Sequence, residues 1–287
     1  MTTTIAPETQ AATRAPYRPN ALKLGLAQAV YEVRGFFRLP DAVFFNFAFP
    51  IMMFAIFATA FSGSLIGGGP NGEGGITAAS YYLPAMLAAG LLLSGVQTLA
   101  IDIATERHDG TLRRFAGTPL PKLSYFIGKI GLVLITAVLQ AAVLIAVAAL
   151  FFGVELPTEM ESWLTFAWVF PLGLAASAVI GIALSRLPRT ARSASAVVVP
   201  PVLLLQFISG VYLPFTQLPE WLQNVAGIFP LRWMAQGLRS VFLPDAFKAV
   251  EQGGAWNLDM VAIVLGVWLV VGLVAATLTF RWLPKDR

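Results

Sequence analysis

The sequence contains no cysteine and only one histidine, His108. Without cysteine the chain forms neither a disulfide nor a thiolate metal site, and a single histidine excludes the His-pair zinc motifs of metalloenzymes. The chain also lacks the Gly-x-Ser-x-Gly elbow of hydrolases and a phosphate-binding loop, because Gly128-Lys129 has no glycine-rich lead and is followed by Ile130. We therefore expect no catalytic residue, no cofactor and no metal site in this chain.

Charge is scarce and long apolar runs are abundant. Charged residues make up 12% of the chain, against about 25% in an average soluble domain, and hydrophobic residues make up 57%. A transmembrane helix needs about 20 apolar residues to cross about 30 Å of hydrocarbon. Runs of sufficient length lie at 42–61, 82–104, 123–152, 163–184, 196–213 and 258–282. We therefore predict an all-α polytopic membrane protein with six transmembrane helices.

The basic residues fall on alternate sides of these six runs. All Lys and Arg residues except Arg232, Arg239 and Lys248 lie before the first run, between the second run and the first turns of the third, between the fourth and fifth, or at the end of the chain. Positive loops stay in the cytoplasm, so both termini are predicted to be cytoplasmic, in a bacterial inner (plasma) membrane. This sorting accounts for the formal charge of +4 without nucleic acid as a partner. Lys129 lies about two turns into the third run, and its side chain is expected to reach the cytoplasmic surface.

The N-terminal region divides into a polar tail and an amphipathic helix. Residues 1–20 have no apolar core, so we expect a disordered cytoplasmic tail and no cleaved signal peptide. In 21–39, apolar residues such as Leu22, Leu26 and Phe36 share one helical face and charged residues share the other. This pattern predicts an interfacial helix, either a simple anchor or an elbow that transmits motion. Residues 21–287 form a single transmembrane domain.

Polar residues follow one helical face of the second run. They are Ser94, Gln97, Thr98, Asp102 and Thr105. Polar side chains in a membrane face protein or water rather than lipid. Two interpretations remain: hydrogen bonds that hold helices together, or a lining for a translocation pathway.

The segment 214–257, between the fifth and sixth runs, has helical pieces separated by proline. Pro219 precedes one piece, which contains Trp221, and Pro230 opens the next, which contains Trp233. We predict a re-entrant helical hairpin that enters the outer leaflet and returns, packed against other spans. The alternative is an ordinary amphipathic surface loop.

A segment of mixed charge follows the second run and is predicted to bind a partner protein. Its residues of interest are Glu106, Arg107, Asp109, Gly110, Thr111, Leu112 and Phe115. Leu112 and Phe115 are expected to be apolar anchors, and Glu106 and Asp109 to accept bonds from partner cations. Gly110 permits a tight turn before Leu112 and Phe115. The alternative is a solvated loop that only holds positive charge inside.

Two motifs in this chain resemble those of the membrane subunits of ABC transporters of the type-2 permease family. The first comprises Glu106, Arg107, Gly110, Thr111, Leu112, Thr118, Pro119, Gly128 and Lys129. The second comprises 209–214, 218–222 and 230–231. The resemblance covers essentially residues 20–287. His108 and Arg113 stand where acidic residues are common in that family, so the partner-facing surface is more basic here.

The resemblance implies a function that composition alone does not. In that family, the segment that matches 106–115 is a coupling helix that sits in a cleft of the ATP-binding subunit, and the re-entrant helices close the outer end. This chain is thus expected to be the permease of an ATP-driven exporter of a lipophilic or amphiphilic compound, a drug or a lipid. Its expected partners are two ABC ATP-binding subunits that hold ATP and magnesium, a second permease copy or a paralogous permease, and membrane lipid.

Two other classes are weighed against this interpretation. A secondary carrier or channel without an ATPase partner is disfavoured because the spans lack the mid-bilayer carboxylate relay of a proton- or sodium-driven carrier. A membrane enzyme is disfavoured because the chain has no nucleophile–base or metal set.

The predicted topology can be tested by cysteine labelling, since the natural chain has no cysteine. Single cysteines that replace Arg114 or Arg189 should resist an impermeant thiol reagent in intact cells, and a cysteine at Glu159 should react, because the basic loops are cytoplasmic. Labelling at 114 or 189 but not at 159 would reverse the orientation.

Overall fold

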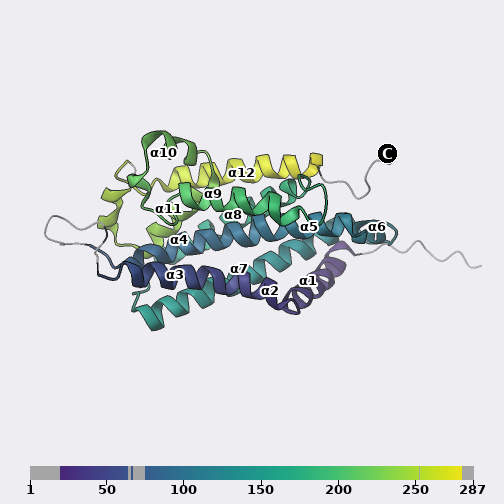
Figure 1. Ribbon diagram of the computed structural model, residues 1–287, viewed down its shortest axis with the longest axis horizontal. Coiled ribbons are helices and arrows are strands. Elements are labelled where there is room, and N and C mark those ends of the chain that lie inside the picture. Colours follow the sequence, from purple (N-terminus) through teal and green to yellow (C-terminus); the bar gives the residue numbers. More distant parts are fainter. Residues whose placement is uncertain (1–19, 64–65, 67–74, 252, 280–287) are drawn as a thin grey trace, which may run out of the picture.

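The computed structural model describes residues 20–63, 66, 75–251 and 253–279, and every regular element in this part of the chain is helical (Figure 1). Five helices are long and apolar enough to cross a membrane. They are Pro40–Ala60 (α2 Pro40–Val43, η1 Phe44–Ala48 and α3 Phe49–Ala60), Ala78–His108 (α4 Ala78–Leu92, η2 Leu93–Thr98 and α5 Leu99–His108), α7 (Lys122–Phe152), α8 (Met160–Leu184) and α12 (Leu258–Thr279). The protein is therefore an all-helical membrane protein.

Shorter helices complete the described part of the chain. They are α1 (Ala21–Phe37), α6 (Thr111–Ala116), α9 (Ala194–Ile208), η3 (Phe215–Gln217), α10 (Glu220–Ala226), α11 (Pro230–Phe242) and η4 (Asp245–Val250). The side chain of Asn20 accepts hydrogen bonds from the backbone N–H groups of Leu22 and Lys23, which fixes the start of α1. Gly153, with φ of 64°, ends the 31-residue α7 in the left-handed conformation that glycine adopts without strain.

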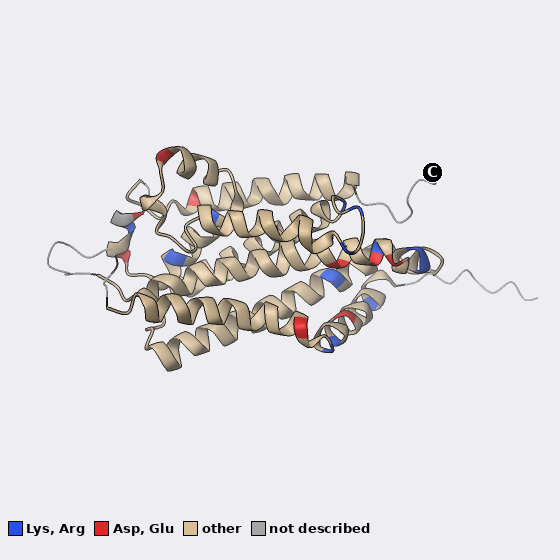
Figure 2. Ribbon diagram, viewed as in Figure 1, with Lys and Arg blue, Asp and Glu red and all other residues tan. Residues whose placement is uncertain are grey.

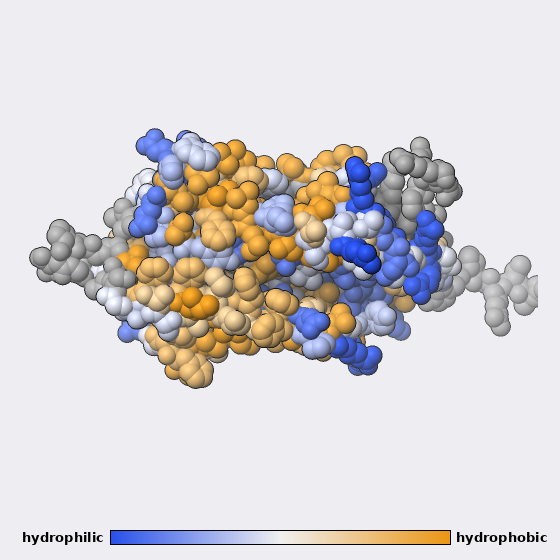
Figure 3. Space-filling model, in the orientation of Figure 1, coloured by the Kyte–Doolittle hydropathy of each residue, from blue (hydrophilic) through white to orange (hydrophobic). Residues whose placement is uncertain are grey.

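The long helices run side by side along the longest axis of the molecule (Figure 1). One end carries α6, and the other carries α10; we call them the α6 end and the α10 end. The described chain begins, at Asn20, and stops, at Thr279, at the α6 end. Charged residues gather at the two ends (Figure 2), while the surface between them is mainly hydrophobic (Figure 3). An apolar belt between charged ends is the surface expected of a bundle embedded in lipid.

The predicted fifth span is wrong in its length. The run 196–213 was expected to cross the membrane, but α9 ends at Ile208 and has 15 residues. Gly210 takes a left-handed conformation, with φ of 78°, and turns the chain toward α10. The apolar residues after the turn, such as Val211 and Tyr212, are buried in the bundle instead of extending the helix. The other five predicted runs each correspond to one of the five long helices.

The amphipathic helix is present as α1, and only part of its apolar face packs on the rest of the protein. Gly25, Ala29 and Phe36 are buried, whereas Leu22 and Leu26 are exposed. The small residues are inside because α1 lies closely against α7: a side-chain carbon on Gly25 would overlap that of Ile127, and one on Gly131 that of Ala29. Close backbone approach through small residues is typical of helix contacts in membranes.

The centre of the bundle is α4–η2–α5, whose apolar window is mostly buried. Both π-helices of the described chain lie in this region: Asn46 of η1 accepts a hydrogen bond from Ser94 of η2 at 3.4 Å, and Gln140 of α7 accepts one from the same hydroxyl at 3.3 Å. Against α8, η2 makes its closest contact where Gly95 meets Gly181. A π-turn inserts an extra residue into the helix, so the polar face predicted from a regular period is interrupted here.

Several predictions fall outside the described residues. They are the disordered tail, apart from Asn20, and the cytoplasmic placement of the basic residues beyond 279.

Replacing Gly181 with valine should destabilise the bundle, because even a methyl group there would overlap the carbonyl oxygen of Gly95 and backbone cannot move aside cheaply. We expect a loss of about 1–3 kcal/mol, or more, measured as a lower melting temperature of the detergent-solubilised protein. The control is Gly266→Val on α12, where nothing lies within 4 Å of the added carbon. Equal losses in the two variants would contradict this packing.

Candidate functional site

A buried ion cluster joins three helices near the α6 end. Lys129 of α7 is completely buried, and its ammonium nitrogen lies 2.9 Å from Glu32 of α1, 2.5 Å from Asp102 and 2.6 Å from Glu106, both of α5. An ammonium group has three N–H donors, so each donor has one carboxylate. The phenol of Tyr125 donates a further bond to Glu106 at 2.6 Å. We call these five residues the Lys129 cluster.

Helical spacing explains how the cluster forms. Asp102 and Glu106 are four residues apart on α5 and so lie one above the other on one face. Lys129 and Tyr125 have the same spacing on α7. Glu32 reaches them because α1 lies so close to α7, with Gln28 packed on Gly128. The predicted escape of Lys129 to the surface is wrong, because its partners are inside.

The three carboxylates could at first sight hold a metal ion. One oxygen each from Glu32, Asp102 and Glu106 lies within 4.8 Å of the others. Carboxylate oxygens are the ligands that hard divalent cations prefer. Here, however, the Lys129 ammonium sits among them and donates to all three, so a lysine occupies the position of a cation. The arrangement is therefore an ion-pair cluster.

The short helix α6 is tied back to the bundle through its neighbours. Gly110, with φ of 85°, makes the tight turn after α5, and Asp109 accepts a hydrogen bond from the backbone of Thr111 at 2.9 Å. Partial desolvation acts in the opposite direction, but the hydrogen bonds from Thr111 hold the pKa of Asp109 below its usual value. Arg107 donates to the carbonyl oxygens of Ser185 at 2.7 Å and Pro188 at 3.3 Å. The end of α5 is thereby joined to the loop between α8 and α9.

The structure corrects the predicted roles of three residues in this segment. Leu112 is 1% exposed and belongs to the hydrophobic core. Phe115 is partly buried, with its ring 6.1 Å from that of Tyr125. Glu106 is engaged by Lys129 and Tyr125. Leu112 and Phe115 lie on the inward face of the six-residue helix α6 and attach it to the bundle, and Glu106 of α5 is bonded within the bundle. None of the three side chains is therefore a free anchor or acceptor for a partner.

The residues that α6 and its flanks do expose are mostly basic or polar. They are His108, Asp109, Arg113, Arg114, Gly117, Thr118 and Pro119. A partner at the α6 end would meet these residues.

The predicted polar face of the second span is divided by η2. Ser94 is buried against Asn46 and Gln140, while Asp102 belongs to the Lys129 cluster. Thr98 donates to the carbonyl of Leu93 in its own helix at 3.2 Å, and Gln97 is half-buried. Ser94 and Asp102 therefore bond to residues of other helices.

The predicted hairpin residues lie at the α10 end. Pro219 precedes α10 and Pro230 is the first residue of α11. Trp221 is 66% exposed, whereas Trp233 is buried and donates to the carbonyl oxygen of Gly227 at 2.8 Å. Nearly all of α11 is buried, and it packs on α4, α8 and α12.

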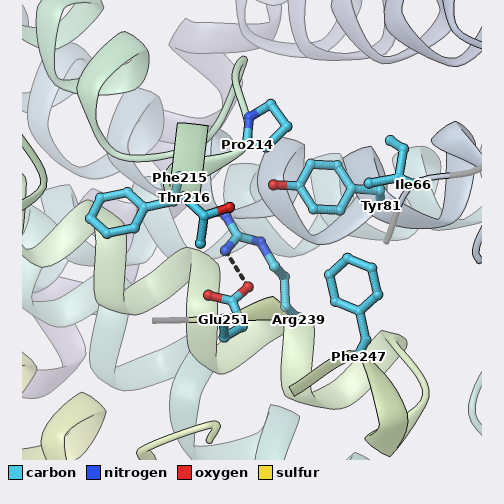
Figure 4. A pocket seen from close by; sticks show the side chains of 8 residues that line it. All are labelled: Ile66, Tyr81, Pro214, Phe215, Thr216, Arg239, Phe247 and Glu251. Carbon is cyan, nitrogen blue, oxygen red and sulfur yellow. Dashed lines mark hydrogen bonds and ion pairs between the residues drawn. The ribbon is translucent and has the colours of Figure 1, made fainter. Parts of the chain in front are cut away.

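A second buried charge pair fixes α11 and was not predicted. Arg239, 2% exposed, donates to Glu251 at 2.7 Å and to the carbonyl oxygen of Gly210 at 2.8 Å, and it lies over the ring of Tyr81 (Figure 4). A cavity of about 20 Å³ adjoins them, which is room for one water molecule. The signal in the sequence is an arginine within the helical, largely apolar stretch 230–242, which requires a partner.

The sequence also carried an unused signal for the Lys129 cluster. A lysine inside a long apolar run requires a partner, and Asp102 and Glu106 are spaced to provide one from a single helix. Glu32 and Tyr125 could not be found in this way, because only the packing of α1 and α7 brings them to the lysine.

The fold and these sites define a polytopic helical membrane protein whose buried charges join helices at each end. Comparison with known proteins identifies its family: the profile of the ABC-2 family transporter protein matches residues 70–281. The chain belongs to the ABC-2 transporter family, and a permease subunit of this family is not itself the ATPase.

Two relatives are similar over most of the chain. One is a "Probable multidrug ABC transporter permease YbhR" of Escherichia coli, present in strains K12 and O157:H7, which is 24% identical over 186 residues. That alignment covers 65% of this chain and half of the relative's length. The other is an "Uncharacterized protein YhgE" of Bacillus subtilis, 24% identical over 212 residues, which are 74% of this chain and 24% of that protein.

Replacing Lys129 with methionine should destabilise the protein by about 3–5 kcal/mol, because three carboxylates would lose their common partner. The readout is the melting temperature in detergent. Lys122→Met, at an exposed position in the first turn of the same helix, should change stability by no more than about 0.5 kcal/mol.

A second variant separates loss of charge balance from loss of packing. Adding Glu32→Gln, Asp102→Asn and Glu106→Gln to Lys129→Met removes the unpaired charges and should recover part of the stability. If Lys129→Met were as stable as the natural protein, the cluster would not hold these helices together.

Proposed function

We propose that this chain is the permease of an ATP-driven exporter in a bacterial inner membrane, working as two permease copies with two separate ATP-binding subunits. Membership of the ABC-2 family supports an ABC ATP-binding partner. The substrate would be a lipophilic or amphiphilic compound, a drug or a lipid, taken from the cytoplasm or the inner leaflet. The printed name of the Escherichia coli relative, a probable multidrug permease, supports this substrate class.

The proposed topology places the α6 end in the cytoplasm. The basic residues of the described chain concentrate there, as the positive-inside rule requires of a cytoplasmic face (Figure 2). In this topology α9 is the fifth of six crossings, both termini are cytoplasmic, and α10 and α11 form a re-entrant hairpin at the outer end. The burial of α11 supports the hairpin, because non-spanning backbone within a membrane must be enclosed by protein.

The observation that carries the proposal is the Lys129 cluster beside α6. It connects α1, α5 and α7, and only Asp109 and Gly110 separate α5 from α6. A displacement of α6 by the ATPase would therefore move the inner parts of all three helices together. Arg107 would carry the same movement to the loop between α8 and α9. The mechanism is mechanical: ATP binding closes the partner dimer, and the permease halves change their packing.

The exposed face of α6 is the proposed docking surface. Arg113 and Arg114 point away from the bundle, and Asp109 lies beside them. This surface suits a cleft of the ATPase that presents acidic groups, with Asp109 setting the orientation. ATP and magnesium would be held by the partner, and this chain would supply no ligand to either.

A secondary carrier remains the alternative, and one observation favours it. The Lys129 cluster itself has three carboxyl groups, of Glu32, Asp102 and Glu106, around one ammonium group. Carriers driven by protons use buried carboxylates of this kind. The proposal instead assigns these carboxylates to fixing Lys129.

Tagged protein in mild detergent should retain an ATP-binding subunit, and the double variant Arg113→Glu/Arg114→Glu should lose it. Reversing two interface charges is expected to lower retention and substrate-stimulated ATP hydrolysis by roughly tenfold or more. Membrane insertion should be unaffected, since both residues are exposed.

Arg189→Glu, an exposed arginine in the loop between α8 and α9, is the control. If it alone abolished retention, docking would belong to that loop. Transport in vesicles without ATP, driven by a pH gradient alone, would instead establish the carrier.

A further inference from the structure

Five aromatic rings gather at the α10 end, between α3, α4 and the turn that follows α9. They are Phe57, Phe61, Tyr82, Phe207 and Tyr212, and we call them the aromatic nest. Phe57 stacks on Tyr82, with ring centres 4.8 Å apart, and on Tyr212, at 5.6 Å. Phe61 lies parallel to Phe57, with 5° between the ring planes. Nearly parallel rings present flat apolar faces in one direction.

A buried hydrogen-bond chain ends beside this nest with an unused donor. The phenol of Tyr82 donates to the carbonyl oxygen of Tyr212 at 3.3 Å, and the phenol of Tyr212 donates to the side-chain oxygen of Gln206. The amide nitrogen Nε2 of Gln206 is buried and has no hydrogen-bond partner among the described residues. The same holds for the hydroxyl of Ser209, which is three residues further along.

Buried polar atoms without partners need an explanation. Gln206 and Ser209 are both 0% exposed. An unpaired donor in an apolar environment is costly, and such atoms in native proteins usually meet water or a ligand. Tyr212 orients the Gln206 amide by holding its oxygen, so the nitrogen is fixed in direction. A fixed donor beside flat rings is the usual composition of a site for a small organic molecule.

The nest also has an open side. Phe207 is 53% exposed and Phe61 is 44% exposed, while Tyr82 and Tyr212 are almost completely buried. A compound dissolved in the bilayer can therefore reach the outer rings laterally without crossing water. Neither the five rings nor Gln206 and Ser209 carry a charge. Arg239, which bonds to Gly210 in the turn that carries Tyr212, is already paired with Glu251.

We propose that the aromatic nest, with Gln206, binds a planar, uncharged aromatic compound that has a hydrogen-bond acceptor. Its rings stack on the exposed rings of Phe61 and Phe207, and its acceptor takes the Nε2 hydrogen of Gln206. This assignment names a substrate class for the exporter and so rests on the proposed function, but binding to the nest can be measured on the permease alone.

Protection of an introduced cysteine in nanodiscs gives a direct test. The reporter is Leu213→Cys, beside Tyr212, where the natural side chain is 47% exposed. The probe is Nile red, a flat, uncharged dye with a carbonyl acceptor. Dye at about ten times its dissociation constant should slow maleimide labelling roughly tenfold. Leu150→Cys, on α7 at the same end and 79% exposed in its natural form, should label at an unchanged rate.

The matched variant is Gln206→Leu combined with Tyr212→Phe. Removing both hydrogen-bond partners avoids leaving the Tyr212 hydroxyl unpaired, so the bundle should keep its melting temperature. Protection of Leu213→Cys should then require about tenfold more dye. Phe45→Leu, on the exposed surface of η1, is the control for loss of an aromatic ring elsewhere.

Three outcomes would overturn the proposal. They are unchanged protection in the double variant, equal protection at positions 213 and 150, and a cysteine at 213 that cannot be labelled even without dye, which would mean that a second copy of the chain covers the nest. The proposed function fails separately, if no ATP-binding subunit associates with a permease that binds the dye.

Discussion

One buried ammonium group determines the arrangement of the α6 end. Lys129 satisfies three carboxylates from two other helices, and removing either side of this set leaves charge inside the bundle without compensation. The position of α1, which has few buried residues of its own, follows from Glu32 and from the glycine contacts with α7. The position of α6 follows from α5, whose inner face the same lysine holds. Four helices thus depend on the protonated state of one side chain.

The α10 end is fixed by a similar device with different connections. Arg239 joins α11 to Glu251 and to Gly210, so it links the segments before and after the buried helix. Between the two ends, contacts are made by small residues and by neutral polar groups: Gly95 on Gly181, and Ser94 with Asn46 and Gln140. Close contacts of this kind resist separation but place few directional demands on the helices. The buried charges thus determine how the helices are arranged at the two ends, and small residues pack closely at the centre.

The sequence predicted the class of fold and most of the spans, because length and hydropathy determine them directly. Five of the six runs became long helices. The fifth run forms a shorter helix, because α9 ends at Ile208 and Gly210 turns the chain within the apolar run, a feature that hydropathy does not register. Periodicity predicted the apolar face of α1, whose Leu22 and Leu26 are exposed, but not the close contact of Gly25 with α7. That contact depends on which helix α1 meets.

The sequence located the candidate site as a segment of the chain but did not predict which residues of that segment contact the bundle. The mixed charges and the motif identified 106–115, yet Glu106 and Leu112 turned out to face the bundle. Spacing along one helix puts Asp102 and Glu106 on one face, but the predictions assigned the two residues to different roles. The packing of α1 and α7 is a tertiary property, so the parts of Glu32 and Tyr125 in the cluster could not be predicted from the sequence.

The shortness of α9 has a consequence for the lipid around the protein. Fifteen residues make a helix of about 22 Å, whereas the hydrocarbon layer is about 30 Å thick. If α9 crosses the membrane as proposed, lipid next to the exposed side chains of Leu204 and Phe207 would compress its acyl chains, or tilt them, to match the shorter surface. Such a thinned annulus would shorten the distance between the two headgroup layers beside α9. The protein would then deform the surrounding lipid asymmetrically, beside α9, the helix that carries Gln206.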